Sequence, residues 1–176
     1  MPGIEACRKV VADIDWECEV HHNYQEKNYG CDPSEYMAQK WAFSLSDKCI
    51  VLEDDDVPAV SFFGFCKELL DKYEHDTRIS MIAGFNNEEI TPDITSDYFF
   101  ATTFSIWGWA SWRRVTDQWD EFYTFLDDKE NMRQLKNLIH TRRYRKDFIY
   151  MCHATANTGK PITKPSSTLP CCSIRV

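Results

Sequence analysis

Two buried strands and two helices are predicted from the hydrophobic pattern of residues 30–85. Apolar residues fall at helical spacing over 60–74, and Asp32 followed by a proline is typical of a helix start, here for a helix that runs to about residue 45. Short apolar runs at 48–52 and 79–84 predict buried strands. A weaker alternation at 18–23 predicts a strand before the first of these helices. The order strand, helix, strand, helix, strand favours parallel pairing with right-handed crossovers.

The remaining segments are less regular. We expect a short helix at 4–13, a polar loop at 85–97 and an extended aromatic stretch at 98–106. A tryptophan-rich segment follows at 107–119, then two helices at 128–142 and 145–156 and a short strand at 161–165. The chain shows no internal repeat and no low-complexity linker, so residues 1–176 are expected to form a single domain.

Composition narrows the class of protein. A hydrophobic content of 43% with 14% aromatic residues indicates a folded domain, and a net charge of −8 argues against nucleic acid or anionic membrane as a partner. The sequence has no apolar stretch near the length of a membrane span and no signal-peptide core, so a cytoplasmic location is expected. The eight cysteines form no Cys-x-x-Cys pair, and we expect reduced, buried thiols.

The candidate chemistry begins at four consecutive acids, Glu53, Asp54, Asp55 and Asp56, directly after the apolar strand. Unpaired carboxylates cannot stay inside a sheet, so the acids are expected at its carboxyl edge, where open α/β sheets bind their ligands. Clustered carboxylates repel one another unless a cation joins them, and oxygen ligands suit Mg²⁺ or Mn²⁺. The alternative is a solvated strand end, because charge runs are common in acidic chains.

A second candidate site is the tryptophan-rich segment. Trp107, Trp109 and Trp112, with Gly108 among them, can form a wall for an acceptor sugar, because aromatic faces stack on the apolar face of sugars and glycine permits close approach. Core packing is the equally weighted alternative. The arginines at 113 and 114 could meet phosphate, although surface arginines are commoner.

The order of these segments resembles a known family. Asn28-Tyr-Gly-Cys, the run Ile50 to Pro58 with its acids, the strand at 79–84, and Ile106-Trp-Gly-Trp-Ala-Ser-Trp-Arg-Arg114 look like bacterial nucleotide-diphospho-sugar transferases. These are glycosyltransferases of the GT-A fold, family 2-like or hemolytic-protein-like. A more distant resemblance is to the N-acetylglucosaminyltransferase I group, which carries Glu-Asp-Asp as its Asp-x-Asp motif. The resemblance covers about residues 4–165.

The resemblance implies an α/β, Rossmann-like GT-A fold with a mostly parallel sheet flanked by helices. The chain starts at what looks like the helix after the family's second strand, so it resembles a member truncated at both ends that lacks the first strands. The resemblance also implies that Asp55 contacts the metal, with Glu53 and Asp54 facing the sugar and ribose. Asp54 with Asp56 is a literal Asp-x-Asp, so the metal contact is uncertain by one residue. Asn28 would lie near the donor, although a plain turn is the favoured alternative.

The resemblance implies that Asp147 is the general base. The alternative is that Asp147 is only an acid at the start of a helix, and Asp127 and Asp128 are then the next candidates for the base. The expected function is Mn²⁺- or Mg²⁺-dependent, inverting transfer of a sugar from a nucleotide-sugar donor to a glycan or lipid-linked acceptor, in surface-glycan assembly. Such an enzyme would work in the cytoplasm or at the inner face of the membrane. The alternative function is a non-catalytic nucleotide-sugar-binding remnant of such an enzyme.

Overall fold

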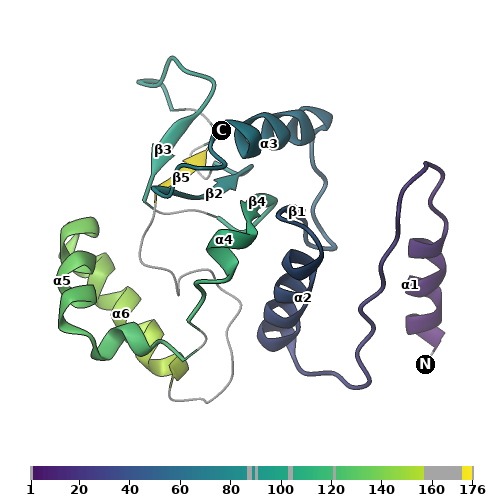
Figure 1. Ribbon diagram of the computed structural model, residues 1–176, viewed down its shortest axis with the longest axis horizontal. Helices are drawn as coiled ribbons and strands as arrows, with labels where there is room; N and C mark the ends of the chain where they lie inside the picture. The colour runs from purple at the N-terminus through teal and green to yellow at the C-terminus, as the bar shows by residue number, and fades with distance from the viewer. Residues whose placement is uncertain are drawn as a thin grey trace.

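A five-stranded sheet with helices on both faces forms the centre of the molecule (Figure 1). The computed structural model describes residues 2–86, 89, 91–102, 105–120, 122–156 and 172–175. The strands are β1 Lys48–Val51, β2 Ile79–Ala83, β3 Phe99–Ala101, β4 Trp109–Trp112 and β5 Cys172–Arg175, and the order across the sheet is β1-β4-β2-β5-β3. The helices are α1 Pro2–Ala12, α2 Cys31–Leu45, α3 Val60–Lys72, α4 Arg113–Thr116, η1 Thr124–Asp127, α5 Lys129–Leu138 and α6 Arg142–Ala156. The chain is therefore of the mixed α/β class, as the sequence predicts.

The pairing differs from the mostly parallel sheet that we expected. Strand β4 lies between β1 and β2 and runs antiparallel to both, β3 pairs antiparallel with β5, and β2 with β5 is the parallel pair. Both Val51 at the end of β1 and Ala83 at the end of β2 stand opposite Trp109. Because β1 and β2 oppose the same strand, they run parallel to each other. The predicted parallel, near-adjacent relation of these two strands is therefore confirmed, with the tryptophan-rich strand inserted between them.

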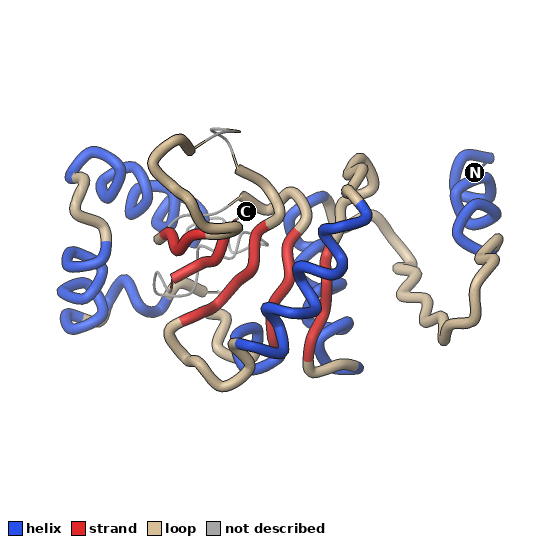
Figure 2. Tube along the Cα trace, turned by 90° about the horizontal axis from the view of Figure 1, so that it is seen from above, coloured by secondary structure: helices blue, strands red, loops and turns tan. Residues whose placement is uncertain are grey.

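Helices α2 and α3 cover opposite faces of the sheet, as Figure 2 shows from above. Along β1, Ile50 packs on the α3 side while its neighbours Cys49 and Val51 pack on the α2 side, which is the two-residue alternation of a strand. The α3 side contains Phe62, Cys66, Leu69 and Leu70 from the helix, and the α2 side is built around Phe43 and Trp109. The apolar periodicity of 60–74 therefore marks a real buried face.

A separate hydrophobic cluster joins η1, α5 and α6 beside the sheet, and Leu135 and Phe148 are among its buried members. The two predicted C-terminal helices are thus present, with bounds at 129–138 and 142–156. This cluster buries Cys152, and the α3 cluster buries Cys66. Burial raises the pKa of each of these two thiols to about 12, so both are protonated. Cys7, Cys18 and Cys31 are exposed, which corrects the expectation of buried thiols for these three.

The N-terminal segment departs furthest from the expectation. Helix α1 forms as predicted, but residues 18–23 have no regular secondary structure, and the whole segment stands away from the sheet in both views (Figures 1 and 2). A strand needs a hydrogen-bonded neighbour, and the described chain offers none to this segment. The strand expected at 161–165 lies outside the described residues. In the part of the chain that the structure describes, no helix is long and apolar enough to cross a membrane.

Arg114 connects the end of α3 to the start of β2 through hydrogen bonds to backbone carbonyls. Its guanidinium donates hydrogen bonds of 2.9–3.2 Å to the carbonyl oxygens of Tyr73, Glu74, Asp76 and Ile79, and it lies 4.4 Å from the ring centroid of Trp112. Arg113 in turn donates to the carbonyl of Phe43 at 2.6 Å. Both arginines therefore hold the fold together and do not face the cavity described below, which corrects their candidate role as phosphate ligands.

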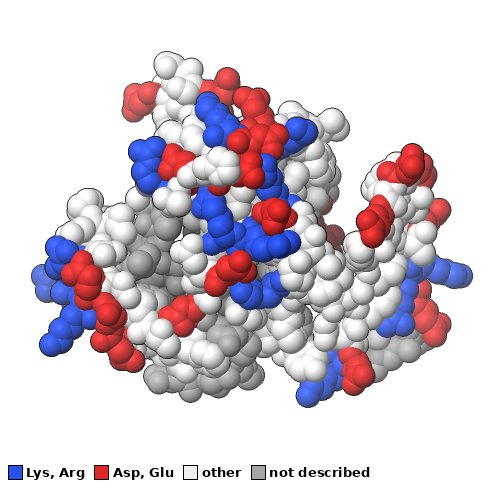
Figure 3. Space-filling model, in the orientation of Figure 1, with Lys and Arg blue, Asp and Glu red and all other residues white. Residues whose placement is uncertain are grey.

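Ion pairs support the same region. Lys48 Nζ lies 2.9 Å from Asp71 and 2.9 Å from Glu74, which links β1 to the end of α3. Figure 3 shows acidic and basic side chains intermingled on the face of the molecule seen in Figure 1. Exposed pairs of this kind contribute little individually. The multiple backbone contacts of Arg114 are therefore the stronger link.

We expect Arg114→Met to lower the free energy of unfolding by about 2 kcal/mol, because it keeps the apolar stem but leaves partly buried carbonyls without their donor. Urea denaturation followed by circular dichroism measures the change. Arg143→Met, at an exposed position of α6, is the matched control and should stay within about 0.5 kcal/mol of the parent protein. Equal effects of the two substitutions would contradict this assignment.

Candidate functional site at the carboxyl edge of the sheet

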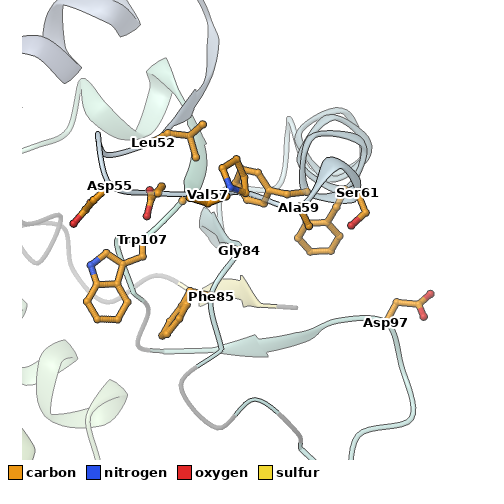
Figure 4. A pocket seen from close by; sticks show the side chains of 14 residues that line it. Leu52, Asp55, Val57, Ala59, Ser61, Gly84, Phe85, Asp97 and Trp107 are labelled. Atoms are coloured by element: carbon orange, nitrogen blue, oxygen red, sulfur yellow. The ribbon is translucent and has the colours of Figure 1, made fainter. Parts of the chain in front are cut away.

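A cavity of about 670 Å³ opens where β1 and β2 end (Figure 4). Its walls come from the segment after β1, the first turns of α3, the residues after β2, the approach to β3 and the residues before β4. The lining residues are Leu52, Asp55, Asp56, Val57, Pro58, Ala59, Ser61, Phe62, Phe65, Gly84, Phe85, Asp97, Trp107 and Gly108. The predicted position of the site, at the carboxyl ends of two parallel strands, therefore coincides with a cavity.

The four acids form a tight turn that places two of them at the cavity wall and two away from it. The backbone N–H of Asp56 donates to the carbonyl of Glu53 at 3.2 Å, and the N–H of Glu53 donates to Oδ2 of Asp56 at 2.9 Å. This closed turn brings Asp55 and Asp56 to the cavity wall, while Glu53 and Asp54 do not line it. Both registers left open by the sequence keep a metal contact at the cavity wall, Asp55 in one and Asp56 in the other, while Asp54 does not line the cavity.

The acid turn is electrostatically strained. Partial burial raises the pKa of Glu53, and the nearby carboxylates of Glu35, Asp56, Asp55 and Asp54 raise it further. A raised carboxyl pKa means that the ionised form is disfavoured where it stands. A cation bound beside the turn would relieve this repulsion.

The residues present fit a divalent cation held jointly with a ligand. Among the described residues, no three His, Cys, Asp or Glu side chains converge as a ready-made metal site. Mg²⁺, however, is commonly bound through one or two carboxylates together with phosphate oxygens and water, and Asp55 and Asp56 provide two carboxylates at the cavity wall. One oxygen of Asp56 already accepts the hydrogen bond from Glu53, so Asp55 is the less committed of the two acids.

The tryptophan-rich segment divides between the cavity and the core. Trp107 is 51% exposed, lines the cavity, and meets Phe85 edge-to-face with ring centroids 4.8 Å apart. Trp109 and Trp112 are only 1% and 2% exposed. The expectation that they form an acceptor wall is therefore wrong, because β4 is an interior strand and both of its faces are covered by helices.

Two glycines shape the cavity floor. Gly108 has a φ of +64°, and its carbonyl accepts a hydrogen bond of 2.8 Å from the N–H of Gly84. A Cβ at Gly84 would lie 2.3 Å from Cε2 of Phe62, a distance that no packed side chain tolerates. The ring of Phe62 therefore occupies the space that the missing side chain leaves, and Gly84 sets its position.

The other predicted site residues lie elsewhere. Asn28 is exposed in the N-terminal segment and its Oδ1 accepts from the N–H of Gly30 at 2.8 Å, which is the turn alternative. Asp147 is exposed on α6 and does not line the cavity; Figure 1 shows α6 packed beside α5, away from α3. Asp127 does not line the cavity either, and Asp128 caps α5 through a 2.7 Å bond from the N–H of Asn131. The carboxylates expected to supply the base are thus not brought to the acids.

Asp97 is the carboxylate that sequence reasoning missed. It lines the cavity from the segment before β3, and Figure 4 places it at the end opposite Asp55, with its carboxyl group turned outward. The adjacent Tyr98 is anchored, because its hydroxyl bonds Lys72 Nζ at 2.8 Å and the Tyr73 hydroxyl at 2.9 Å. An isolated acid in a polar loop gives no periodic signal, so only the fold reveals its place.

Comparisons with protein-family models, with curated proteins and with solved structures find no match to this chain.

We expect Gly84→Ala to disrupt the cavity, because the added Cβ must displace the Phe62 ring. The substitution should lower the free energy of unfolding by about 1–3 kcal/mol through overpacking. Urea denaturation measures the change. Gly64→Ala on α3 is the control: its Cβ would meet nothing within 4 Å, so the same substitution should stabilise the helix by about 0.5–1 kcal/mol. The assignment fails if Gly84→Ala is as stable as Gly64→Ala.

Proposed function

We propose that the cavity binds a nucleotide-sugar together with Mn²⁺ or Mg²⁺, and that the protein transfers the sugar to an acceptor hydroxyl. The observation that carries this proposal is the placement of Asp55 and Asp56 on the wall of a largely apolar cavity at the carboxyl ends of two parallel strands. That edge is where open α/β sheets bind ligands. A volume of about 670 Å³ lies within the range of small-molecule sites.

The chemistry of the lining suits the separate parts of such a donor. Two carboxylates next to each other need a cation, and a divalent cation in turn binds diphosphate oxygens. Trp107 presents an exposed ring in the same cavity, and aromatic faces stack on the C–H face of sugars. Between these two features the ring of Phe62, packed against Gly84 and Gly108, presents a further apolar surface to the cavity.

The finer assignment to the GT-A fold is part of the proposal. It is supported by the parallel relation of β1 and β2, by the helices on both faces, and by the acid turn directly after β1. The departure from the expected mostly parallel sheet is due to β4, which carries the tryptophan-rich segment into the middle of the sheet, and to β3, which pairs antiparallel with β5 at the edge.

The proposed reaction is a single displacement that inverts the anomeric carbon. The acceptor oxygen forms a bond to that carbon while the bond from the carbon to the diphosphate oxygen breaks, and the nucleoside diphosphate leaves with the electron pair. A divalent ion, when bound by Asp55 and Asp56, supplies charge neutralisation for the leaving diphosphate. The hydroxyl proton passes to a carboxylate, and Asp97 is the cavity carboxylate outside the acid turn; its carboxyl group, which is turned outward, must rotate toward the cavity to accept this proton.

A second candidate function is binding of a nucleotide-sugar without turnover. The observation that favours it is the position of Asp147, which the resemblance implies as base but which is exposed outside the cavity. Donor binding belongs to both functions. Sugar transfer belongs to the first function alone. The two functions are therefore separated by whether a labelled donor sugar reaches an acceptor, and by whether substitution of Asp97 lowers the rate of that transfer.

We expect Asp55→Ala to lower the affinity for a nucleoside diphosphate in the presence of Mn²⁺ by at least about tenfold, because it removes the less committed metal ligand. Isothermal titration calorimetry with GDP and UDP, with and without Mn²⁺, measures this effect. Asp54→Ala is the matched control in the same turn, since Asp54 is exposed and does not line the cavity. Unchanged metal-dependent binding in Asp55→Ala, or no such binding in the parent protein, would refute the proposed site.

We expect Asp97→Asn to keep donor binding and to lower the rate of sugar transfer by about 10²-fold, because the amide cannot accept the hydroxyl proton. Radiolabelled nucleotide-sugars incubated with candidate acceptors measure transfer. Asp93→Asn, an exposed acid of the same loop that does not line the cavity, serves as control. Transfer at the parent rate by Asp97→Asn would remove Asp97 from the mechanism, and a parent protein without transfer would favour the binding function.

A further inference from the structure

Large apolar side chains are exposed to solvent around the mouth of the cavity. Val57 is 96% exposed and Val60 89% exposed, and Leu52, Phe63 and Trp107 are each exposed by more than a third. We call these five residues the apolar rim. Three of them, Leu52, Val57 and Trp107, line the cavity itself.

The rim continues from the cavity onto the first turn of α3. Val60 lies between the cavity residues Ala59 and Ser61, and the ring of Phe63 contacts the cavity residue Phe62 with centroids 5.7 Å apart. The core contacts of α3 come from other positions of the helix, Phe62, Cys66, Leu69 and Leu70, which are buried. The rim residues are therefore apolar positions outside the core, and exposed apolar side chains gathered at a cavity mark a binding surface.

Charge decides what the rim can bind. Leu52 and Val57 directly flank the acid turn, Glu53 to Asp56, and Asp97 lies at the other end of the cavity. An anionic lipid surface brought to this mouth would meet like charge. An uncharged alkyl chain meets no such repulsion and covers the apolar side chains.

We infer that the acceptor is an uncharged amphiphile, whose hydroxyl-bearing head enters the cavity and whose alkyl chain lies on the rim residues Val57, Val60 and Phe63, while Trp107 remains with the donor sugar. This inference rests on the proposed function and specifies the class of acceptor. The acids and the bound donor occupy one wall of the cavity, and the rim provides the path from the cavity to solvent along α3.

The test uses methyl, hexyl and octyl glucosides below their micelle concentrations. Binding is followed by tryptophan fluorescence, in the presence of Mn²⁺ and a nucleoside diphosphate. Full burial of each methylene strengthens binding by about fourfold, so partial cover should give at least about tenfold between methyl and octyl glucoside. Equal affinity for the three glucosides, with metal-dependent nucleotide binding intact, would overturn the inference and leave the proposed function standing.

Val60→Ser should reduce the ratio of the affinity for octyl glucoside to that for methyl glucoside. Because Val60 is exposed, this substitution should not destabilise the fold. Val10→Ser on α1, where the valine is 75% exposed and far from the cavity residues in sequence, should leave the ratio unchanged. A chain-length effect that survives Val60→Ser would move the alkyl site away from the rim and refute the inference.

Two further outcomes are informative. A chain-length effect without any nucleotide binding would show that the rim binds alkyl groups while the proposed function is wrong, and it would overturn the acceptor assignment. Binding to vesicles of uncharged phospholipid, with no preference among the soluble glucosides, would identify the rim as a membrane contact and would also overturn it.

Discussion

Strand β4 must satisfy its backbone hydrogen bonds on both edges, because it is completely buried between β1 and β2. Its ladders to the two neighbours bring the ends of both strands to the level of Trp109. The pairing continues beyond the strands, through the bond from Gly84 N–H to the Gly108 carbonyl at 2.8 Å and from Arg113 N–H to the Asp47 carbonyl at 2.8 Å. The walls after β1, after β2 and before β4 start where these ladders end, so three walls of the site depend on this single strand.

Local patterns were sufficient for the elements on either side of β4. Helix α3 and strands β1 and β2 each carry their own periodicity, and their predicted parallel relation is present. The insertion of β4 could not be predicted in this way, because antiparallel pairing between segments far apart in the chain leaves no local trace. The same limit explains why Trp109 and Trp112 looked like a wall for ligands: a buried strand and an aromatic binding surface have the same composition.

Single acids were harder to place than segments. The run from Glu53 to Asp56 predicted a carboxylate cluster at a strand end, but only the closed turn shows that Asp55 and Asp56 line the cavity. Asp147 shares its chemistry with these residues and is nevertheless exposed on α6, in a cluster that packs independently of the cavity. Asp97 had no distinguishing neighbours in the sequence. Position relative to a strand end was therefore a better guide than residue type.

The two buried thiols have a consequence for how the folding of this protein can be followed. Cys66 belongs to the cluster under α3, and Cys152 to the cluster of η1, α5 and α6. Each is shielded from reagents, and each has a pKa near 12, so neither reacts until its surroundings open. The rates at which Cys66 and Cys152 are alkylated would therefore report the opening of the sheet core and of the helical cluster separately, in the same chain without added probes.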